Sequence, residues 1–530
     1  MRATFLGTVR AGDLSARRAE HSRFPYVLPA ERGAIQSSDG ADLAIDRLAV
    51  DVTASPNLVT DPVGVAARLA PILKRSPGAL ATTLSQGGVY AVLARNVPPA
   101  SADAARALGL PGIYFSDTYQ RFLPGGPQAA QVLGLTGDQH EGLSGMEKQL
   151  DPALTGVAGR RVEVRDLFGR PIQVLSDREP VPGEDVRLAM DSRIQNEVER
   201  TLSATRAKFG ARSAMAIVMR PKDGAILAMA TVPRFNPNQR HQINPDLERN
   251  RPVTDTFEPG STFKIVTMTA ALEDGKVTPS TTFDLPVSVT KYAGTPSEYT
   301  LVDDHRTAPA RMTASEILAR SSNIGTYTIG TRVGEDRLKA WISRFGFGSL
   351  TGIDYPGEVA GAVLHDWSGT SSLNIPIGYG TALTLTQLAR AYAAVANGGT
   401  LVTPHLVAAV GGKNVTPPGR RIMHEATARS LSRMLRGVVD PQGTGSLAEV
   451  KGFEVAGKTG TAKKFDPSTG TYSDTAYTAS FVGYAPAENP QLLVAVVVDE
   501  PHGSIYGGDV AAPAFEQIAT FSLQTLRITP

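Results

Sequence analysis

The stretch Glu258-Pro-Gly-Ser-Thr-Phe-Lys264 decides how the second half of this chain is interpreted. Its proline and glycine predict a turn, and the apolar run from Ile265 to Leu272 predicts a helix after that turn. Residues three positions apart on a helix share one face, so Ser261 and Lys264 should lie side by side. The lysine amine could then accept the serine's proton and turn its hydroxyl into a nucleophile at a helix N-terminus. A lone Ser-x-x-Lys pair is also common on solvated helices, so this chemistry needs support from elsewhere in the chain.

A second group of polar residues follows a predicted helix. Thr313-Ala-Ser-Glu316 is typical of a capping box, and Ser321-Ser-Asn323 comes shortly after it. The Ser321 hydroxyl could relay a proton to a leaving amine, and the Asn323 amide could hold a substrate carbonyl. Serine and asparagine also favour helix ends for local reasons, so this motif is weak on its own.

A third motif, Lys458-Thr-Gly-Thr461, is predicted at the end of a strand-like segment that begins at Phe453. Lys458 with the hydroxyls of Thr459 and Thr461 could bind a carboxylate, and Gly460 could let a substrate approach the backbone closely. The backbone N–H groups of Thr461 and Ser261 could form an oxyanion hole. The three motifs occur in the order typical of serine acyl-enzymes that act on peptides and β-lactams.

The composition narrows the possible functions. The chain has 530 residues, of which 42% are hydrophobic and 20% charged, and its net charge is +2. A nearly neutral net charge and the lack of a long run of basic residues argue against a nucleic-acid partner. There is no cysteine, which excludes disulfides and thiol catalysis, and the eight histidines form no His-x-His or His-x-x-x-His pair. We therefore expect no metal and no cofactor.

The proline-rich segment Glu179-Pro-Val-Pro-Gly183 predicts a boundary between two domains, at residues 1–183 and 184–530. In the first, residues 48–53 alternate like a strand and Asp61-Pro62 begins a helical pattern, but no catalytic group is evident. This domain is interpreted as a spacer or docking module.

The second domain is predicted to be of the α+β class, with an antiparallel sheet packed against helices. Ala214–Met219 and Ala225–Ala230 predict a hairpin with an Asp-Gly turn. Further predicted elements are a helix at Thr384–Asn397, strands at Phe453–Ala456, Ala479–Val482 and Leu492–Val498, and a last helix from about Ala512 to Leu526.

Motifs throughout the chain resemble those of one family. They are Arg32-Gly-Ala-Ile35 with Asp39-Gly and Leu43-Ala, Gly142-Leu-Ser-Gly-Met-Glu147, Arg249-Asn-Arg, Glu258 to Lys264, Gly378-Tyr-Gly380 with Thr386-Gln387, Gly457-Lys-Thr-Gly-Thr-Ala462, Ser480-Phe-Val-Gly-Tyr-Ala-Pro486 and Tyr506-Gly-Gly508. Together they resemble a class B penicillin-binding protein, a monofunctional peptidoglycan D,D-transpeptidase. The resemblance implies a transpeptidase domain of the penicillin-binding and serine β-lactamase type, preceded by an elongated pedestal or dimerisation-type domain.

The resemblance also implies a mechanism and partners. Ser261 would attack the penultimate D-Ala carbonyl of a stem peptide with Lys264 as the base, and Ser321 would pass the proton. Asn323 would position the donor, and Lys458 with Thr459 and Thr461 would hold its terminal carboxylate. A β-lactam would trap Ser261. The other implied partners are a membrane glycan polymerase and further division or elongation proteins, and the compact first domain is more similar to the division type.

Two features depart from the family pattern. Ser37-Ser38 stands where members usually have Asp-Arg, which touches only the pedestal. Members also carry an N-terminal membrane anchor, whereas no segment here is long and apolar enough to span a bilayer and Met1–Gly7 has no signal-peptide core. We expect a protein at the extracytoplasmic face of the bacterial cytoplasmic membrane whose usual single-pass anchor is missing from this sequence.

Three alternatives stay open at this point. Gly452-Phe-Glu-Val-Ala-Gly-Lys-Thr459 fits the P-loop pattern of ATPases, although Gly460 argues against the helix that should follow it. A β-lactamase or β-lactam sensor would share Ser261 and Lys264 but would leave the first domain unexplained. A non-catalytic scaffold of a cell-wall complex would have no need for all three motifs.

Overall fold

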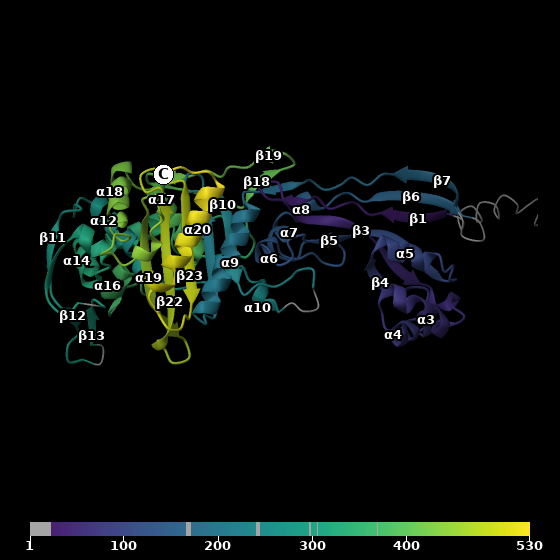
Figure 1. The fold of residues 1–530 in the computed structure, drawn as a ribbon, viewed down its shortest axis with the longest axis horizontal. Helices are drawn as coiled ribbons and strands as arrows, with labels where there is room; N and C mark the ends of the chain where they lie inside the picture. Colours follow the sequence, from purple (N-terminus) through teal and green to yellow (C-terminus); the bar gives the residue numbers. More distant parts are fainter. Residues whose placement is uncertain (1–22, 166–170, 240–243, 296–297, 305, 368) are drawn as a thin grey trace, which may run out of the picture.

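The computed structural model describes residues 23–165, 171–239, 244–295, 298–304, 306–367 and 369–530. Figure 1 shows an elongated molecule with a large lobe at one end. Long strands extend from it towards a smaller lobe that contains α3 (Pro62–Leu73) and α4 (Pro77–Ser85). No helix in the described ranges is long and apolar enough to cross a membrane. The segment Met1–Gly7 lies outside the described residues.

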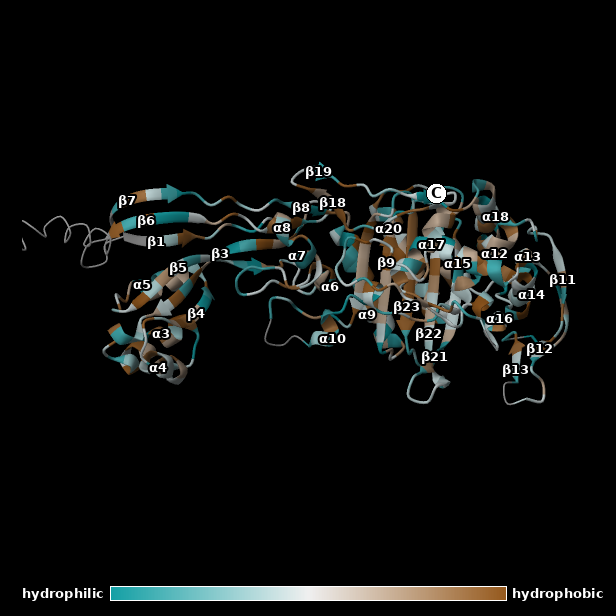
Figure 2. Cartoon of the chain, turned by 180° about the vertical axis from the view of Figure 1, so that it is seen from behind, coloured by the Kyte–Doolittle hydropathy of each residue, from teal (hydrophilic) through white to brown (hydrophobic). Residues whose placement is uncertain are grey.

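A five-stranded antiparallel sheet forms the centre of the large lobe, in the order β10-β9-β23-β22-β21. Its strands are β9 (Ser213–Met219), β10 (Ile226–Val232), β21 (Ala456–Asp466), β22 (Thr471–Ala485) and β23 (Leu492–Asp499). Side chains along a strand point to alternate faces. In β9, Ala214, Ala216 and Val218 join one hydrophobic core, and Met215, Ile217 and Met219 join another. The sheet is therefore buried on both faces, as its hydrophobic colouring in Figure 2 indicates.

Helices cover the two faces. The first core contains apolar residues of α9 (Ser192–Lys208) and α20 (Ala512–Thr525). On the other face lie α17 (Leu385–Ala396) and α12 (Lys264–Glu273), and nearly every residue of α12 is buried. Around α12 pack α14 (Asn323–Val333), α15 (Glu335–Arg344) and α18 (Glu425–Arg436). The helix that begins with Lys264 is thus the centre of the helical layer.

The other elements of the large lobe are mostly short. They are β8 (Val186–Leu188), α10 (Pro245–Glu248), α11 (Arg251–Thr254), η3 (Gly260–Phe263), β11 (Thr282–Leu285), β12 (Ser288–Lys291), β13 (Tyr299–Val302), β14 (Ala310–Thr313), α13 (Ala314–Ala319), β15 (Ala362–Val363), α16 (Ser371–Asn374), η4 (Ile375–Ile377), β16 (Thr381–Ala382), β17 (Thr400–Leu401), β18 (Val407–Val410), β19 (Lys413–Asn414), β20 (Arg420–Arg421), η5 (Ser446–Ala448) and α19 (Gly507–Val510).

The N-terminal region consists mainly of strands. Besides α3 and α4, its elements are β1 (Arg23–Leu28), β2 (Ile35–Gln36), β3 (Asp42–Ala54), η1 (Pro56–Leu58), β4 (Ala91–Val97), α5 (Pro99–Arg106), β5 (Ile113–Phe122), α6 (Ala130–Leu133), α7 (Gly145–Gln149), α8 (Asp151–Leu154), β6 (Gly159–Arg165) and β7 (Pro171–Arg178). A seven-stranded sheet connects this region to the large lobe, because β8 pairs with both β2 and β18. The domain boundary at Gly183 therefore stays a prediction.

Five charged residues, all buried except Asp151, form a network in the N-terminal region. Arg32 Nε and Arg121 Nε each donate to one carboxylate oxygen of Glu147, at 2.7 Å. Arg32 Nη1 also lies 2.7 Å from Asp151 Oδ1, and Arg121 Nη1 lies 3.2 Å from Asp46 Oδ1. The side chains of Arg32, Arg121 and Glu147 are each 2% exposed or less. This network connects β3 and β5 to α7 and α8.

Most predicted elements are confirmed, including the α+β class, the hairpin at β9–β10 and the capping box at Thr313. The strand predicted at Phe453–Ala456 is wrong in its bounds, because β21 begins at Ala456 and continues to Asp466. Lys458 to Thr461 therefore lie inside a strand. Glycines disfavour strand structure locally, but pairing with β22 overrides that preference. The P-loop interpretation is also excluded, because β21 continues through Lys458 to Asp466 and no helix begins there.

Candidate active site

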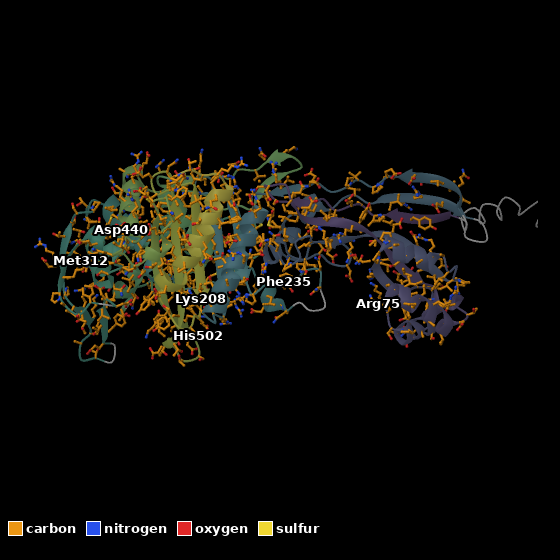
Figure 3. All side chains as sticks on the ribbon, viewed as in Figure 1. Arg75, Lys208, Phe235, Met312, Asp440 and His502 are labelled. Carbon is orange, nitrogen blue, oxygen red and sulfur yellow. The ribbon has the colours of Figure 1, made fainter. Side chains whose placement is uncertain are left out.

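The three sequence motifs converge on one cleft of about 630 Å³. Its lining includes Ser261, Ser321, Asn323, Thr459 and Thr461. Met312 also lines it, and Figure 3 places this residue at the end of the molecule opposite Arg75 of the small lobe. The cleft is therefore remote from the small lobe that contains α3 and α4.

Ser261 lies in the 3-10 turn η3, directly before α12, and is partly exposed to the cleft. The turn packs closely against its surroundings. Gly260 has φ +52°, and its N–H donates to Gly378 O at 3.1 Å. A Cβ on Gly378 would lie 2.0 Å from Gly260 O, so both positions need glycine. Tight packing thus fixes the backbone that presents the serine.

Glu258 connects the same turn to two neighbouring segments. Its Oε1 accepts hydrogen bonds from Gly380 N at 2.7 Å and from the Tyr472 hydroxyl at 2.9 Å. Burial raises the pKa of this carboxyl, and the two hydrogen bonds counteract only part of the rise. Glu258 therefore connects the nucleophile turn, the segment from Pro259 to Phe263 that carries Ser261, to Gly380 and Tyr472.

Lys264 begins α12 and is fully buried. Its Nζ donates to Ser321 O at 2.6 Å, to Asn323 Oδ1 at 2.7 Å and to Ser321 Oγ at 3.2 Å. Among the described residues, no hydrogen bond joins Lys264 Nζ to Ser261 Oγ. Burial lowers the pKa of Lys264 to about 7, although Asp303 and Asp304 oppose the shift. An amine with such a pKa is partly neutral near pH 7 and can accept a proton.

Ser321 and Asn323 lie where α13 ends and α14 begins. Ser321 has φ +57°, a conformation that serine seldom adopts and that is often found at functional sites. The Asn323 side chain is engaged on both sides, since its Oδ1 accepts from Lys264 and its Nδ2 donates to Val302 O at 3.1 Å. The structure thus shows Asn323 holding the lysine.

The third motif lies on β21, the edge strand of the central sheet. Thr459 Oγ1 lies 2.7 Å from Thr444 Oγ1, and Thr461 Oγ1 accepts from Gly507 N at 3.1 Å. Lys458 is fully buried, and its Nζ donates to Thr459 O at 3.2 Å. Burial, together with the nearby Lys264, holds the pKa of Lys458 well below its ordinary value.

Gly460 has a different neighbour from the predicted one. A Cβ at this position would lie 2.9 Å from Thr262 Cγ2 and 3.0 Å from Pro259 O, both in the segment that carries Ser261. It would also lie 2.4 Å from Ser480 Oγ. The glycine therefore allows the nucleophile turn to pack on β21, and its contact with a substrate stays a prediction.

Several cleft residues were not predicted as part of the site. They are Asp303, Arg306, Arg320, Tyr379, Gly443, Thr444, Tyr506 and Asp509. Tyr379 and Tyr506 belong to motifs that carry the family resemblance, which is the signal that could have identified them. Asp303 and Arg306 lie in a loop without a recognisable pattern, so no local signal points to them.

Comparisons with known proteins identify the family of both parts of the chain. Residues 214–520 match the model of the penicillin-binding protein transpeptidase domain, and residues 27–188 match that of the penicillin-binding protein dimerisation domain. The chain is 33% identical to the probable peptidoglycan D,D-transpeptidase PenA of Neisseria meningitidis, covering 100% of this chain and 90% of the relative. It is 32% identical to the peptidoglycan D,D-transpeptidase FtsI of Escherichia coli, covering 98% and 87%.

Solved structures give the same result. The crystal structure of penicillin-binding protein 3 from Mycobacterium tuberculosis, complexed with aztreonam, superposes with a TM-score of 0.75 and 30% identity, over 95% of this chain and 98% of that chain. Penicillin-binding protein 2X from Streptococcus thermophilus shares the fold, with a TM-score of 0.78. The chain therefore belongs to the class B penicillin-binding proteins, the peptidoglycan D,D-transpeptidases with a dimerisation domain before the transpeptidase domain.

Proposed function

We propose that this D,D-transpeptidase cross-links peptidoglycan stem peptides through an acyl-enzyme on Ser261. The observation that carries the proposal is Lys264, a buried amine with a pKa of about 7 that lies three residues after Ser261 and donates to Ser321 and Asn323, which line the same cleft as Ser261. A general base works best when its pKa lies near the working pH.

In the first half-reaction, Ser261 Oγ attacks the carbonyl of the penultimate D-Ala, and its proton passes to the neutral Lys264 amine. The peptide bond to the terminal D-Ala breaks, and the leaving amine receives a proton by way of Ser321. Lys264 Nζ already lies 3.2 Å from Ser321 Oγ, which provides a route for that proton. The product is an ester between Ser261 and the donor peptide.

In the second half-reaction, an amine of a neighbouring stem peptide attacks the ester carbonyl. A peptide bond forms, the bond to Ser261 Oγ breaks, and the proton lost by the amine returns to the serine. We assign the oxyanion hole to the N–H groups of Ser261 and Thr461. We assign the binding of the donor carboxylate to Lys458, Thr459 and Thr461, and the positioning of the donor to Asn323.

We further propose that β-lactams acylate Ser261, by analogy with the aztreonam complex of the Mycobacterium tuberculosis relative. We place the protein at the extracytoplasmic face of the cytoplasmic membrane, where its substrate lies. There it would act with a membrane glycan polymerase and other division or elongation proteins. Residues 1–183 would form the pedestal and residues 184–530 the transpeptidase domain.

Mass spectrometry of the whole protein after penicillin treatment tests the proposal. We expect one covalent adduct on the native protein and none on Ser261→Ala. Ser343→Ala, which removes an exposed hydroxyl on α15, is the matched control and should keep the adduct. An undiminished adduct on Ser261→Ala, or none on the folded native protein, would contradict the proposal. Release of hydrolysed penicillin within seconds would instead indicate a β-lactamase.

A further inference from the structure

Asp303 lies in the loop after β13 and contacts the start of α14 at three points. Its Oδ1 accepts hydrogen bonds from Asn323 N at 2.6 Å and from Ile324 N at 3.0 Å. Its Oδ2 accepts from Ser322 Oγ at 2.8 Å. The first N–H groups of a helix have no partner within the helix, so a carboxylate that accepts from them fixes where the helix begins. Here that carboxylate comes from a separate segment of the chain.

The helix start that Asp303 fixes is the part of the active site that holds Lys264. Asn323 Oδ1 accepts from Lys264 Nζ, and Asn323 Nδ2 donates to Val302 O, the residue before Asp303. The loop therefore holds the backbone and the side chain of Asn323 together. A displaced loop would move the amide oxygen that orients the lysine amine.

Arg306 anchors the loop itself. Its Nε donates to Asp303 Oδ2 at 2.9 Å, and the side chains of the pair are only 12% and 9% exposed. Its other nitrogens donate to the carbonyls of Leu285, Pro286 and Ala308. The ion pair thus connects the end of β11 to the start of α14. Burial would raise the pKa of Asp303, but the hydrogen bonds from Ile324, Ser322 and Arg306 outweigh it and keep the carboxyl ionised.

We propose that Asp303 is a positioning residue for the acylation of Ser261, which holds Asn323 and through it the amine of Lys264. This inference rests on the proposed function of Ser261. The charged groups that act on Lys264 are Asp303 and Asp304 from this loop and Lys458 from β21. Asp303 thus contributes both geometry and negative charge, and the two contributions can be separated by experiment.

The test measures the second-order rate of acylation of the full chain by a fluorescent penicillin from pH 5.5 to 9. In Asp303→Asn, an NH₂ group would replace one of the two accepting oxygens, where Ser322 and Arg306 both donate. We expect the plateau rate at high pH to fall by about 10- to 100-fold, the scale of an orientation error at a catalytic group. The variant also loses a negative charge near Lys264, so the pKa of the lysine should fall. The acid limb of the pH–rate profile, where the rate rises with pH, should therefore move to lower pH.

Asp304→Asn is the matched control, since it removes the same charge from the next residue, which makes no hydrogen bond to α14 among the described residues. It should move the acid limb in the same direction and keep the plateau within about twofold. Asp303→Glu keeps the charge but displaces it by one methylene. It should lower the plateau rate without moving the acid limb of the pH–rate profile. If thermal unfolding shows that Asp303→Asn does not fold, Asp303→Glu takes its place in the test.

The outcomes distinguish this inference from the proposed function. If native protein acylates Ser261 but the folded Asp303 variants keep its plateau rate, Asp303 has no positioning role. The same conclusion follows if Asp303→Asn behaves like Asp304→Asn. If native protein forms no adduct on Ser261, the proposed function itself fails.

Discussion

The N-terminal region and the active site both bury positive charge, but only one of them neutralises it. In the N-terminal region, Arg32 and Arg121 share Glu147 and each has a further carboxylate, Asp151 or Asp46. In the active site, Lys264 and Lys458 are equally buried, yet neither forms a salt bridge among the described residues. The hydrogen bonds of Lys264 go to neutral oxygens of Ser321 and Asn323.

The difference separates charge that holds a structure from charge that performs chemistry. A buried arginine with matched carboxylates stays charged and fixes the elements that it joins. A buried amine without a carboxylate loses part of its charge, because burial favours the neutral form. The result at Lys264 is a pKa of about 7, which suits a proton acceptor. The following predictions test this contrast.

The largest effect should come from Lys264→Met, which removes the amine but keeps an apolar chain of similar length. Loss of a general base lowers the rate by about 10²- to 10⁴-fold, and we expect the acylation of Ser261 by penicillin to fall accordingly. The fold should remain, because the substitution breaks no salt bridge and removes only the hydrogen bonds from the amine to Ser321 and Asn323. Stopped-flow acylation and thermal unfolding measure the two quantities. Lys222→Met, an exposed lysine, should change neither, and a Lys264→Met protein that acylates normally would remove the basis of the contrast.

The converse substitution, Glu147→Gln, should affect stability and leave the chemistry intact. It would leave two buried guanidinium groups with a neutral amide, and breaking a buried ion pair costs about 3–5 kcal/mol. Amide hydrogen exchange in β3 and β5 should become faster by the corresponding factor, while the acylation rate per folded molecule stays unchanged. Glu488→Gln breaks the exposed contact with Arg436, where Glu488 is 82% exposed, and should cost about 1 kcal/mol or less. Equal losses for the two variants would show that the buried network adds nothing to stability.

The third prediction concerns pH. Because the neutral form of Lys264 accepts the proton, the acylation rate should rise with pH and level off above about pH 7. Below that value it should fall nearly tenfold per pH unit. Lys458 titrates in the same site, so the limb can deviate from the slope for a single group. Acylation rates measured from pH 5.5 to 8 check this, with the intrinsic hydrolysis of the penicillin subtracted, and a flat profile would exclude Lys264 as the base.

The sequence predicts what local patterns encode and misses what long-range contacts decide. Ser261 and Lys264 are three residues apart, and a helical pattern follows them, so the turn and the helix that carry them were predictable. The order of the motifs and the family resemblance predicted that Ser321 and Lys458 belong to the same site. The network of Arg32 with Glu147 joins residues more than a hundred positions apart, and no periodicity signals that pairing. No sequence pattern signals the contacts of Asp303 with α14, the left-handed backbone of Ser321 or the packing of Thr262 on Gly460 either.

The smallest effect is expected from a glycine-to-alanine substitution, which can be made once in each of the two regions. In Gly460→Ala, the new methyl would lie 2.4 Å from Ser480 Oγ, 2.9 Å from Thr262 Cγ2 and 3.0 Å from Pro259 O, so the two side chains must move and the turn that carries Ser261 must shift slightly. We expect a loss of about 1–3 kcal/mol in stability and about a tenfold slower acylation. Gly78→Ala, in helix α4, has only Ser76 Oγ within 4 Å, at 3.9 Å, and should be neutral or slightly stabilising. Thermal unfolding and acylation rates of both variants decide the matter. If Gly460→Ala keeps the native acylation rate, the close contact between β21 and the nucleophile turn does not position Ser261, and the active site would tolerate the same local changes as the N-terminal region.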